Sequence, residues 1–238
     1  MCMLEVNNFI IMHEFEPFTD RGDAGQQLAQ ALRHYAGRDD VLVLALPRGG
    51  VPVAYPVAQA LNAELDLMLV RKLGLPNQPE YAMGTIGSGG VRVLQPGVPG
   101  LMGVTQAQVD AVSRHEEAEL ARREQHYRGA RAPLTLTGRC VILVDDGIAT
   151  GASMGAAVQI ARSQQPARLV VATPVAAPGA LQALTGLVDE VVCLFAPERF
   201  RAVSGWYHCF EQTRDDEVQY LLDQAWAPLR DASSQPQP

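Results

Sequence analysis

VILVDDGIATGAS, the stretch at residues 141–153, decides the fold. Its first four residues are all apolar, which is typical of a central strand in a parallel sheet that is buried on both faces. Asp145 and Asp146 follow this strand directly, at the end where open α/β sheets bind their ligands. A helical pattern begins near Ala152. We therefore predict an α/β protein with a polar site at the carboxyl edge of its sheet.

The loop after the two acids has the composition of an anion site. Thr150, Gly151 and Ser153 place hydroxyl and backbone N–H groups at the start of the predicted helix, where a phosphate binds readily. Two carboxylates beside such a site indicate a ligand that also carries hydroxyls or a metal, and a sugar phosphate fits. The alternative is an ordinary surface loop. We disfavour it because adjacent acids at a buried strand end repel each other unless a ligand or cation compensates.

The same stretch resembles the motif by which type I phosphoribosyltransferases bind phosphoribosyl pyrophosphate (PRPP): an apolar strand, two acids, a short variable stretch and Thr-Gly-(Ser/Thr). The resemblance implies that Asp145 and Asp146 hold the ribose hydroxyls. It also implies that the 5-phosphate lies on the following loop, which consists of Ala149, Thr150, Gly151, Ala152 and Ser153. The implied cofactor is Mg²⁺, held through PRPP and through water on the two acids rather than by direct protein ligands.

Two further basic features follow predicted strands. Pro47-Arg48-Gly49-Gly50 combines a cation with two amides that lack side chains, so an anion can approach closely. By resemblance this loop binds pyrophosphate, and its peptide could be strained or even cis. Arg71 and Lys72 close the next predicted strand, and by resemblance Lys72 reaches the pyrophosphate with support from Arg71. The catalytic set implied by the family is therefore Asp145, Asp146, Lys72 and Arg48.

The C-terminal part carries candidate contacts to the acceptor. Phe200, Trp206 and Tyr207 could stack on a flat ring, although ordinary core packing is the competing interpretation. Residues 196–200 faintly resemble the stretch by which hypoxanthine-guanine enzymes cover their base. Those enzymes carry an aspartate just before the Thr-Gly, where this chain has Ala149, and this departure counts against 6-oxopurines. The implied reaction transfers ribose 5-phosphate to a nucleobase-like nitrogen and releases pyrophosphate.

The remaining sequence alternates apolar runs with helical patterns. We expect strands at residues 41–46, 65–70, 169–175 and 190–195, a hairpin at 81–94, and helices at 20–35, 51–61, 105–127, 152–163 and 180–184. Strands separated by helices favour right-handed βαβ units. The predicted fold class is α/β: an open, mainly parallel twisted sheet with helices on both faces and a small flap or hood. In domain terms, we expect an N-terminal extension at 1–11 that could be disordered, one domain at 12–230 with a lid at 72–95 and a hood segment at 196–215, and a disordered tail at 231–238.

Composition narrows the class of protein. The 238 residues are 47% hydrophobic and 19% charged, enough for one full core, and the net charge of −7 argues against nucleic acid as a partner. Cys2, Cys140, Cys193 and Cys209 show no metal-binding spacing, so reduced thiols in a cytoplasm are expected. No apolar run reaches the roughly 20 residues of a membrane helix, so no membrane partner is expected. The expected partners are PRPP and a small acceptor, and the sequence leaves open whether the protein forms a homodimer.

Two other functions compete with a transferase. A non-catalytic regulator that senses PRPP or a nucleotide would keep the acids and the phosphate loop. Catalysis also needs Arg48 and Lys72, which are present. A serine hydrolase is less favoured: residues 151–155 match G-x-S-x-G, and Asp189 and His208 follow in the required order. However, Ser153 lies too far beyond its strand for a nucleophile on a strand-to-helix turn.

Overall fold

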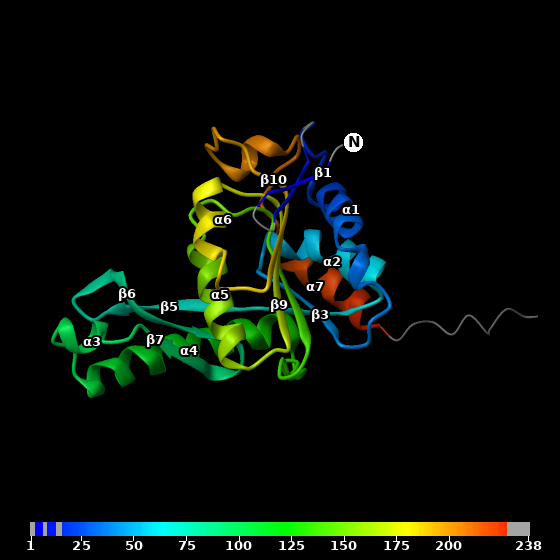
Figure 1. The fold of residues 1–238 in the computed structure, drawn as a ribbon. Helices are drawn as coiled ribbons and strands as arrows, with labels where there is room; N and C mark the ends of the chain where they lie inside the picture. The colour runs from blue at the N-terminus through cyan, green and yellow to red at the C-terminus, as the bar shows by residue number, and fades with distance from the viewer. Residues whose placement is uncertain (1–2, 7–8, 13–15, 228–238) are drawn as a thin grey trace, which may run out of the picture.

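A seven-stranded sheet forms the centre of the molecule (Figure 1). The computed structural model describes residues 3–6, 9–12 and 16–227. Six strands of the sheet are parallel, and only the edge strand β1 is antiparallel to its neighbour. In spatial order the strands are β1 (Met3–Val6), β2 (Phe9–Met12), β10 (Glu190–Phe195), β9 (Arg168–Val175), β8 (Cys140–Val144), β3 (Val41–Ala45) and β4 (Glu64–Leu67). The strand that precedes the two acids, β8, is central and has five buried residues.

Helices cover both faces of this sheet (Figure 1). On one face lie α1 (Arg21–Ala31), α2 (Gly50–Leu61) and α7 (Asp215–Trp226); on the other lie α5 (Ala152–Ser163) and α6 (Pro178–Leu184). Alternate residues along β8 accordingly belong to two different apolar cores: Ile142 packs with the α1 and α2 side, and Leu143 with the α5 side. This two-sided burial is why the strand sequence is uniformly apolar.

A second, antiparallel sheet projects from the domain. It contains β5 (Val70–Leu75), β6 (Gln78–Gly87) and β7 (Val91–Leu94), and it is followed by the short helix α3 (Val98–Leu101) and the long helix α4 (Gln106–Arg128). Met83 and Ile86 on β6 are fully buried. This sheet includes most of the predicted lid at 72–95 and contains the predicted hairpin. Whether it moves as a lid stays a prediction.

The C-terminal segment crosses the carboxyl edge of the main sheet. After β10 the chain forms the short 3₁₀ helix η3 (Val203–Trp206), drawn in orange at the top of Figure 1. Tyr207 then forms a parallel bridge with Phe18. The predicted hood segment at 196–215 therefore lies next to the predicted site, since Val203 occupies the space where a side chain on Gly147 would be.

The predicted α/β fold class is confirmed, and two regions differ from the sequence-based expectation. Met3–Val6 and Phe9–Met12 form strands at the sheet edge, although residues 1–11 were predicted to be an extension outside the domain. Residues 215–226, to which no element was assigned, form α7. The predicted disordered tail at 231–238 lies outside the described residues. Among the residues that are described, no helix is both long and apolar enough to cross a membrane.

Candidate active site at the carboxyl edge of the sheet

The two predicted acids lie where the sequence placed them, directly after β8. The loop that carries them is fixed at both ends: the Asp145 N–H donates to the Ala172 carbonyl at 3.4 Å, and the Ile148 N–H donates to the Val175 carbonyl at 2.9 Å. Within the loop, the Asp146 N–H donates to Oδ1 of Asp145 at 2.9 Å. The loop is therefore held between β8 and β9 in a defined conformation.

Burial sets the electrostatics of the acid pair. The side chain of Asp146 is only 15% exposed. Burial raises the pKa of Asp145 well above its usual range, and the neighbouring charge of Asp146 adds to this effect. Burial also raises the pKa of Asp146, against the opposing influence of the Arg21 guanidinium. Carboxylates held in this way are stabilised by hydrogen-bond donors, and ribose hydroxyls are such donors.

The predicted pyrophosphate loop packs directly against the acids. It follows β3, and its Pro47–Arg48 peptide is cis. A Cβ atom on Gly49 would lie 2.1 Å from Oδ2 of Asp146, and one on Gly50 would lie 2.7 Å from the carbonyl oxygen of Val144. Glycine is therefore required at both positions because the two loops are in contact. The sequence pattern had predicted glycines here for a different reason, the close approach of an anion, and that reason stays a prediction.

The predicted phosphate loop presents free backbone donors. Gly151 precedes α5 with φ of 77°, a left-handed conformation that favours glycine. Among the described residues, the N–H groups of Ala149, Thr150, Gly151 and Ser153 have no hydrogen-bond acceptor, whereas that of Ala152 lies 3.4 Å from Oγ1 of Thr150. Unpaired amides at the start of a helix attract an anion. The loop thus offers several free N–H donors to an anion, and its role as the phosphate site stays a prediction.

Arg21 was not predicted, yet it contacts the acid pair. Its Nε donates to Oδ2 of Asp146 at 2.7 Å, and its side chain is 12% exposed. Arg21 is the first residue of α1, where the helix dipole disfavours a cation. Arg21 stands between Asp20 and Asp23, acids of the kind that favour a helix start. A cation at this position was the signal in the sequence that could have indicated a distant partner.

The predicted basic residues are distributed over different elements. Arg48 lies beside the acid loop, and its Nη1 is 3.6 Å from Oδ1 of Asp215 on α7. Arg71 pairs with Glu116 of α4, and Nζ of Lys72 donates to the Glu80 carbonyl at 3.0 Å. Among the described residues, neither of these two side chains forms a hydrogen bond or ion pair with the acid or phosphate loops.

The prediction that Arg71 and Lys72 close a strand of the main sheet is therefore wrong. The strand β4 ends at Leu67, and both basic residues belong to β5 of the second sheet. The chain leaves the main sheet at Leu69, which exchanges hydrogen bonds with Ser88: the Leu69 N–H donates to Ser88 Oγ at 3.1 Å, and the Ser88 N–H donates to the Leu69 carbonyl at 2.9 Å. This long-range pairing redirects an apolar run that reads as continuous in the sequence.

The three predicted stacking residues lie in different surroundings. Tyr207 is 6% exposed, and its ring packs against Phe18 and Phe210, with centroids 5.4 and 4.9 Å away. Its hydroxyl donates to the Asp146 carbonyl at 2.5 Å. Tyr207 therefore supports the acid loop and has no ring face open to an acceptor. Trp206 packs against Phe195 and, like Phe200, is partly buried against the core.

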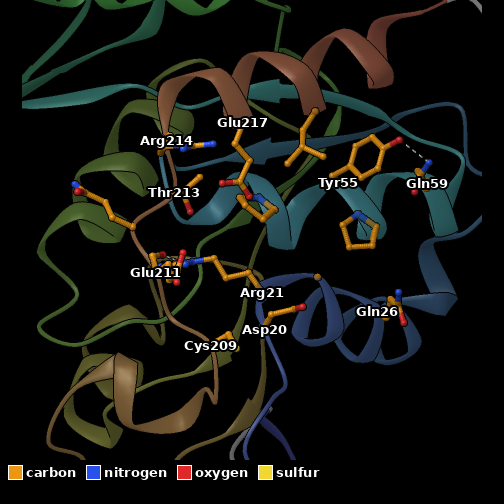
Figure 2. A pocket seen from close by; sticks show the side chains of 15 residues that line it. Asp20, Arg21, Gln26, Tyr55, Gln59, Cys209, Glu211, Thr213, Arg214 and Glu217 are labelled. Atoms are coloured by element: carbon orange, nitrogen blue, oxygen red, sulfur yellow. Dashed lines mark hydrogen bonds between the residues drawn. The ribbon is translucent and has the colours of Figure 1, made fainter.

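A groove adjoins the site on its α1 side (Figure 2). It has a volume of about 780 Å³ and lies between α1, α2 and the chain that leads into α7. In Figure 2 the Arg21 side chain extends from α1 toward Glu211. Thr213 lines the groove and is 4% exposed, and its buried hydroxyl has no partner among the described residues. Arg21 belongs both to this groove and to the acid pair.

The structure rules out the hydrolase triad of Ser153, Asp189 and His208, which was the less favoured alternative. Ser153 lies at the start of α5, at the carboxyl edge of the sheet. Asp189 precedes β10 at the opposite edge, where it accepts from Arg162 at 2.9 Å and from the Leu169 N–H at 2.7 Å. A serine and an acid at opposite ends of parallel strands cannot act on one histidine.

Comparisons with known proteins agree with this geometry. Two curated relatives, each named "Putative phosphoribosyl transferase" and found in two strains of Mycobacterium tuberculosis, are 48% identical over 217 residues. The match covers 91% of this chain and 49% of each relative, so the chain spans about half their length. A crystal structure from Thermus thermophilus has a TM-score of 0.79 and 42% identity, covering 88% of this chain and 99% of that one.

A family model described as "Phosphoribosyl transferase domain" matches residues 18–194. This range contains the acid pair, the phosphate loop, the glycine loop after β3 and Arg21. The family resemblance of the motif at residues 141–153 is thereby confirmed, and the chain belongs to the phosphoribosyl transferase domain family.

Proposed function

We propose that the protein is a phosphoribosyltransferase that binds PRPP with Mg²⁺ and transfers ribose 5-phosphate to a nucleobase-like nitrogen. One observation carries this proposal: two partly buried carboxylates lie on the same short loop as a row of unpaired backbone N–H groups at the start of α5. The amides suit a phosphate, and the carboxylates suit hydroxyl donors a few residues away. A ribose 5-phosphate carries both groups.

The protein's own groups would act by positioning and charge. The 5-phosphate would lie on residues 149–153 and the ribose hydroxyls on Asp145 and Asp146. Arg48 and the amides around Gly49 would stabilise the departing pyrophosphate. Lys72, with Arg71, would reach it from the second sheet if that sheet moves toward the site. Because the bond to pyrophosphate breaks toward an oxocarbenium-like sugar, such electrostatic stabilisation lowers the barrier without a protein nucleophile.

The donors at this edge fit a hydrated Mg²⁺ held through the substrate. Within the described residues, no group of three or more His, Cys, Asp or Glu side chains gathers as a metal site. Carboxylate oxygens of Asp145 and Asp146 could contact the ion through water, while pyrophosphate and ribose oxygens supply direct ligands. When bound, the ion neutralises charge that develops on the pyrophosphate.

The acceptor would enter beneath the hood segment. Phe200 and Trp206 are partly buried there, and Ala149 offers no acid for a purine nitrogen. Of the two alternatives, a PRPP-sensing regulator would use the same carboxylates and amides. Catalytic turnover therefore distinguishes a transferase from a regulator, whereas PRPP binding is expected of both.

The experiment has two stages. Thermal shift with Mg²⁺ and PRPP, compared with inorganic phosphate, tests binding, and we expect the larger stabilisation with PRPP. Release of pyrophosphate is then measured with a panel of purine and pyrimidine bases. Release that depends on one base supports the transferase. Binding without release for any base favours the regulator, and the lack of any PRPP effect would contradict the sugar-phosphate site.

A further inference from the structure

Arg21 links the acid pair to the C-terminal segment. Its Nε donates to Asp146 at 2.7 Å, its Nη1 donates to the Glu211 carbonyl at 2.7 Å, and its guanidinium lies 3.9 Å from the centroid of the Phe210 ring. These three contacts occupy an arginine at the first position of α1, where the helix dipole disfavours its charge. Ordering this side chain costs conformational entropy, and its position opposes the helix dipole. Contacts that persist against both costs indicate a specific role for Arg21.

We propose that Arg21 is a positioning residue of the PRPP site, which holds the Asp146 carboxylate in the orientation that accepts a ribose hydroxyl and ties it to residues 207–211. This inference rests on the proposed function of the acid pair. Arg21 itself would not touch the sugar.

The contacts around Asp146 explain how one arginine can set its orientation. The backbone of Asp146 is fixed by the hydroxyl of Tyr207 on its carbonyl and by Oδ1 of Asp145 on its N–H. Gly49 closes one side of the carboxylate. Arg21 occupies Oδ2 and leaves Oδ1 for a ligand. With the backbone already fixed, the remaining freedom of this side chain is rotation about its own bonds, and Arg21 removes it.

The same residue connects the carboxylate to the hood. Tyr207 contacts Asp146 directly, and Phe210 and Glu211 contact Arg21. Residues 207–211 are thus attached to the acid loop at both ends. A planar guanidinium can donate in two directions while it stacks on a ring, which a lysine ammonium cannot reproduce.

Three variants test the proposal. Arg21→Met keeps the apolar stem and removes the charge and donors, and Arg21→Lys keeps the charge with a single donor group. Arg214→Met is the matched control, because Arg214 lines the same groove but pairs only with Asp216 among the described residues, at 3.2 Å, and its side chain is 78% exposed. Affinities for PRPP with Mg²⁺ and for inorganic phosphate are measured by titration calorimetry, after melting curves have shown that each variant is folded.

We expect Arg21→Met to weaken PRPP binding roughly 10- to 100-fold, as for loss of a charged hydrogen-bond partner, and to leave phosphate binding within about twofold. Arg21→Lys should recover part of the loss, and Arg214→Met should match the wild type. Equal losses for both ligands would overturn the proposal, since a merely structural arginine would affect the whole site. Unchanged or tighter PRPP binding would also overturn it, because Arg21 would then be irrelevant or a competitor of the sugar.

The inference and the proposed function fail in different ways. If the proposed function is wrong, the wild-type protein itself does not bind PRPP. If only the inference is wrong, the wild type binds and Arg21→Met binds equally well or loses both ligands alike. Should Arg21→Met not fold, Arg21→Lys decides the question: a loss confined to PRPP supports the proposal, and wild-type affinity overturns it.

Discussion

Replacing Gly49 by alanine tests whether the position of the Asp146 carboxylate matters. Gly49 has φ of −60° and ψ of −31°, a backbone conformation that alanine adopts without strain. The added methyl group would lie 2.1 Å from Oδ2 of Asp146 and 2.6 Å from its Cγ. Something must move, and the least constrained atoms are those of the carboxylate. Gly49→Ala therefore displaces Asp146 from Arg21 without a direct change to either residue.

The size of the effect follows from these contacts. Relief of a single overpacked methyl group typically costs about 1–3 kcal/mol, and alanine recovers about 0.4–1 kcal/mol by restricting the unfolded chain. We expect a net loss of roughly 0–2.5 kcal/mol in the free energy of unfolding. The free energy of PRPP binding should become less favourable by about 1.5–3 kcal/mol, because one charged hydrogen bond to ribose is lost.

Urea unfolding and titration with PRPP and Mg²⁺ measure the two effects. Gly155→Ala is the matched control: it lies within α5, and a Cβ there meets no atom within 4 Å. Alanine should stabilise that helix by about 0.5–1 kcal/mol and leave PRPP affinity unchanged. The reasoning would be refuted if Gly49→Ala bound PRPP as tightly as the wild type, since the carboxylate would then not need its observed position.

Three further changes test other parts of the structure. Tyr207→Phe removes the donor to the Asp146 carbonyl and should lower unfolding free energy in urea by about 1–2 kcal/mol; no change would contradict the assigned bond. Asp145→Asn should raise the melting temperature at neutral pH, because burial raises the pKa of Asp145 and makes its ionised form costly in the folded state. Melting curves should show this advantage fading as pH falls through that raised pKa toward about 4, and an advantage independent of pH would contradict it. Arg128 of α4 pairs with Asp66 of β4 at 2.8 Å, and the two side chains are 1% and 4% exposed. Arg128→Met leaves Asp66 as a buried charge without its ion-pair partner and should cost about 3–5 kcal/mol in urea unfolding, whereas a loss below about 1 kcal/mol would contradict this buried pairing.

Local patterns predicted much of the fold and of the site. Helix α5 begins and ends where the sequence placed it, because Gly151 supplies the left-handed start and the apolar periodicity continues to its end. Strand β10 also has the predicted bounds. The sequence revealed the acid pair, the glycine loop after β3 and the predicted phosphate loop, because the residues of each lie within a few consecutive positions. They follow strands whose ends the parallel topology brings together.

Contacts between distant residues account for what the sequence did not reveal. Arg21 and Asp146 are 125 positions apart, so their ion pair has no local pattern. Phe9–Met12 pairs with β10 across nearly the whole chain, and a short apolar run alone does not show that it completes a sheet edge. Helix α7, in contrast, could have been predicted from a local pattern. Its first turn is acidic, and Val218 and Leu222, which are buried in the structure, are four residues apart as on one face of a helix.

The most direct test of the sugar-phosphate site is isothermal titration of the Asp145→Asn/Asp146→Asn double variant. Asparagine keeps the shape of both side chains and removes the charge that strengthens their bonds to hydroxyls. Affinity for PRPP with Mg²⁺ should fall by about 2–4 kcal/mol, roughly 30- to 1,000-fold, while phosphate on the amides of residues 149–153 should bind as before or slightly better. Undiminished PRPP affinity would contradict the account, and equal losses for both ligands would mean that the acids only maintain the loop.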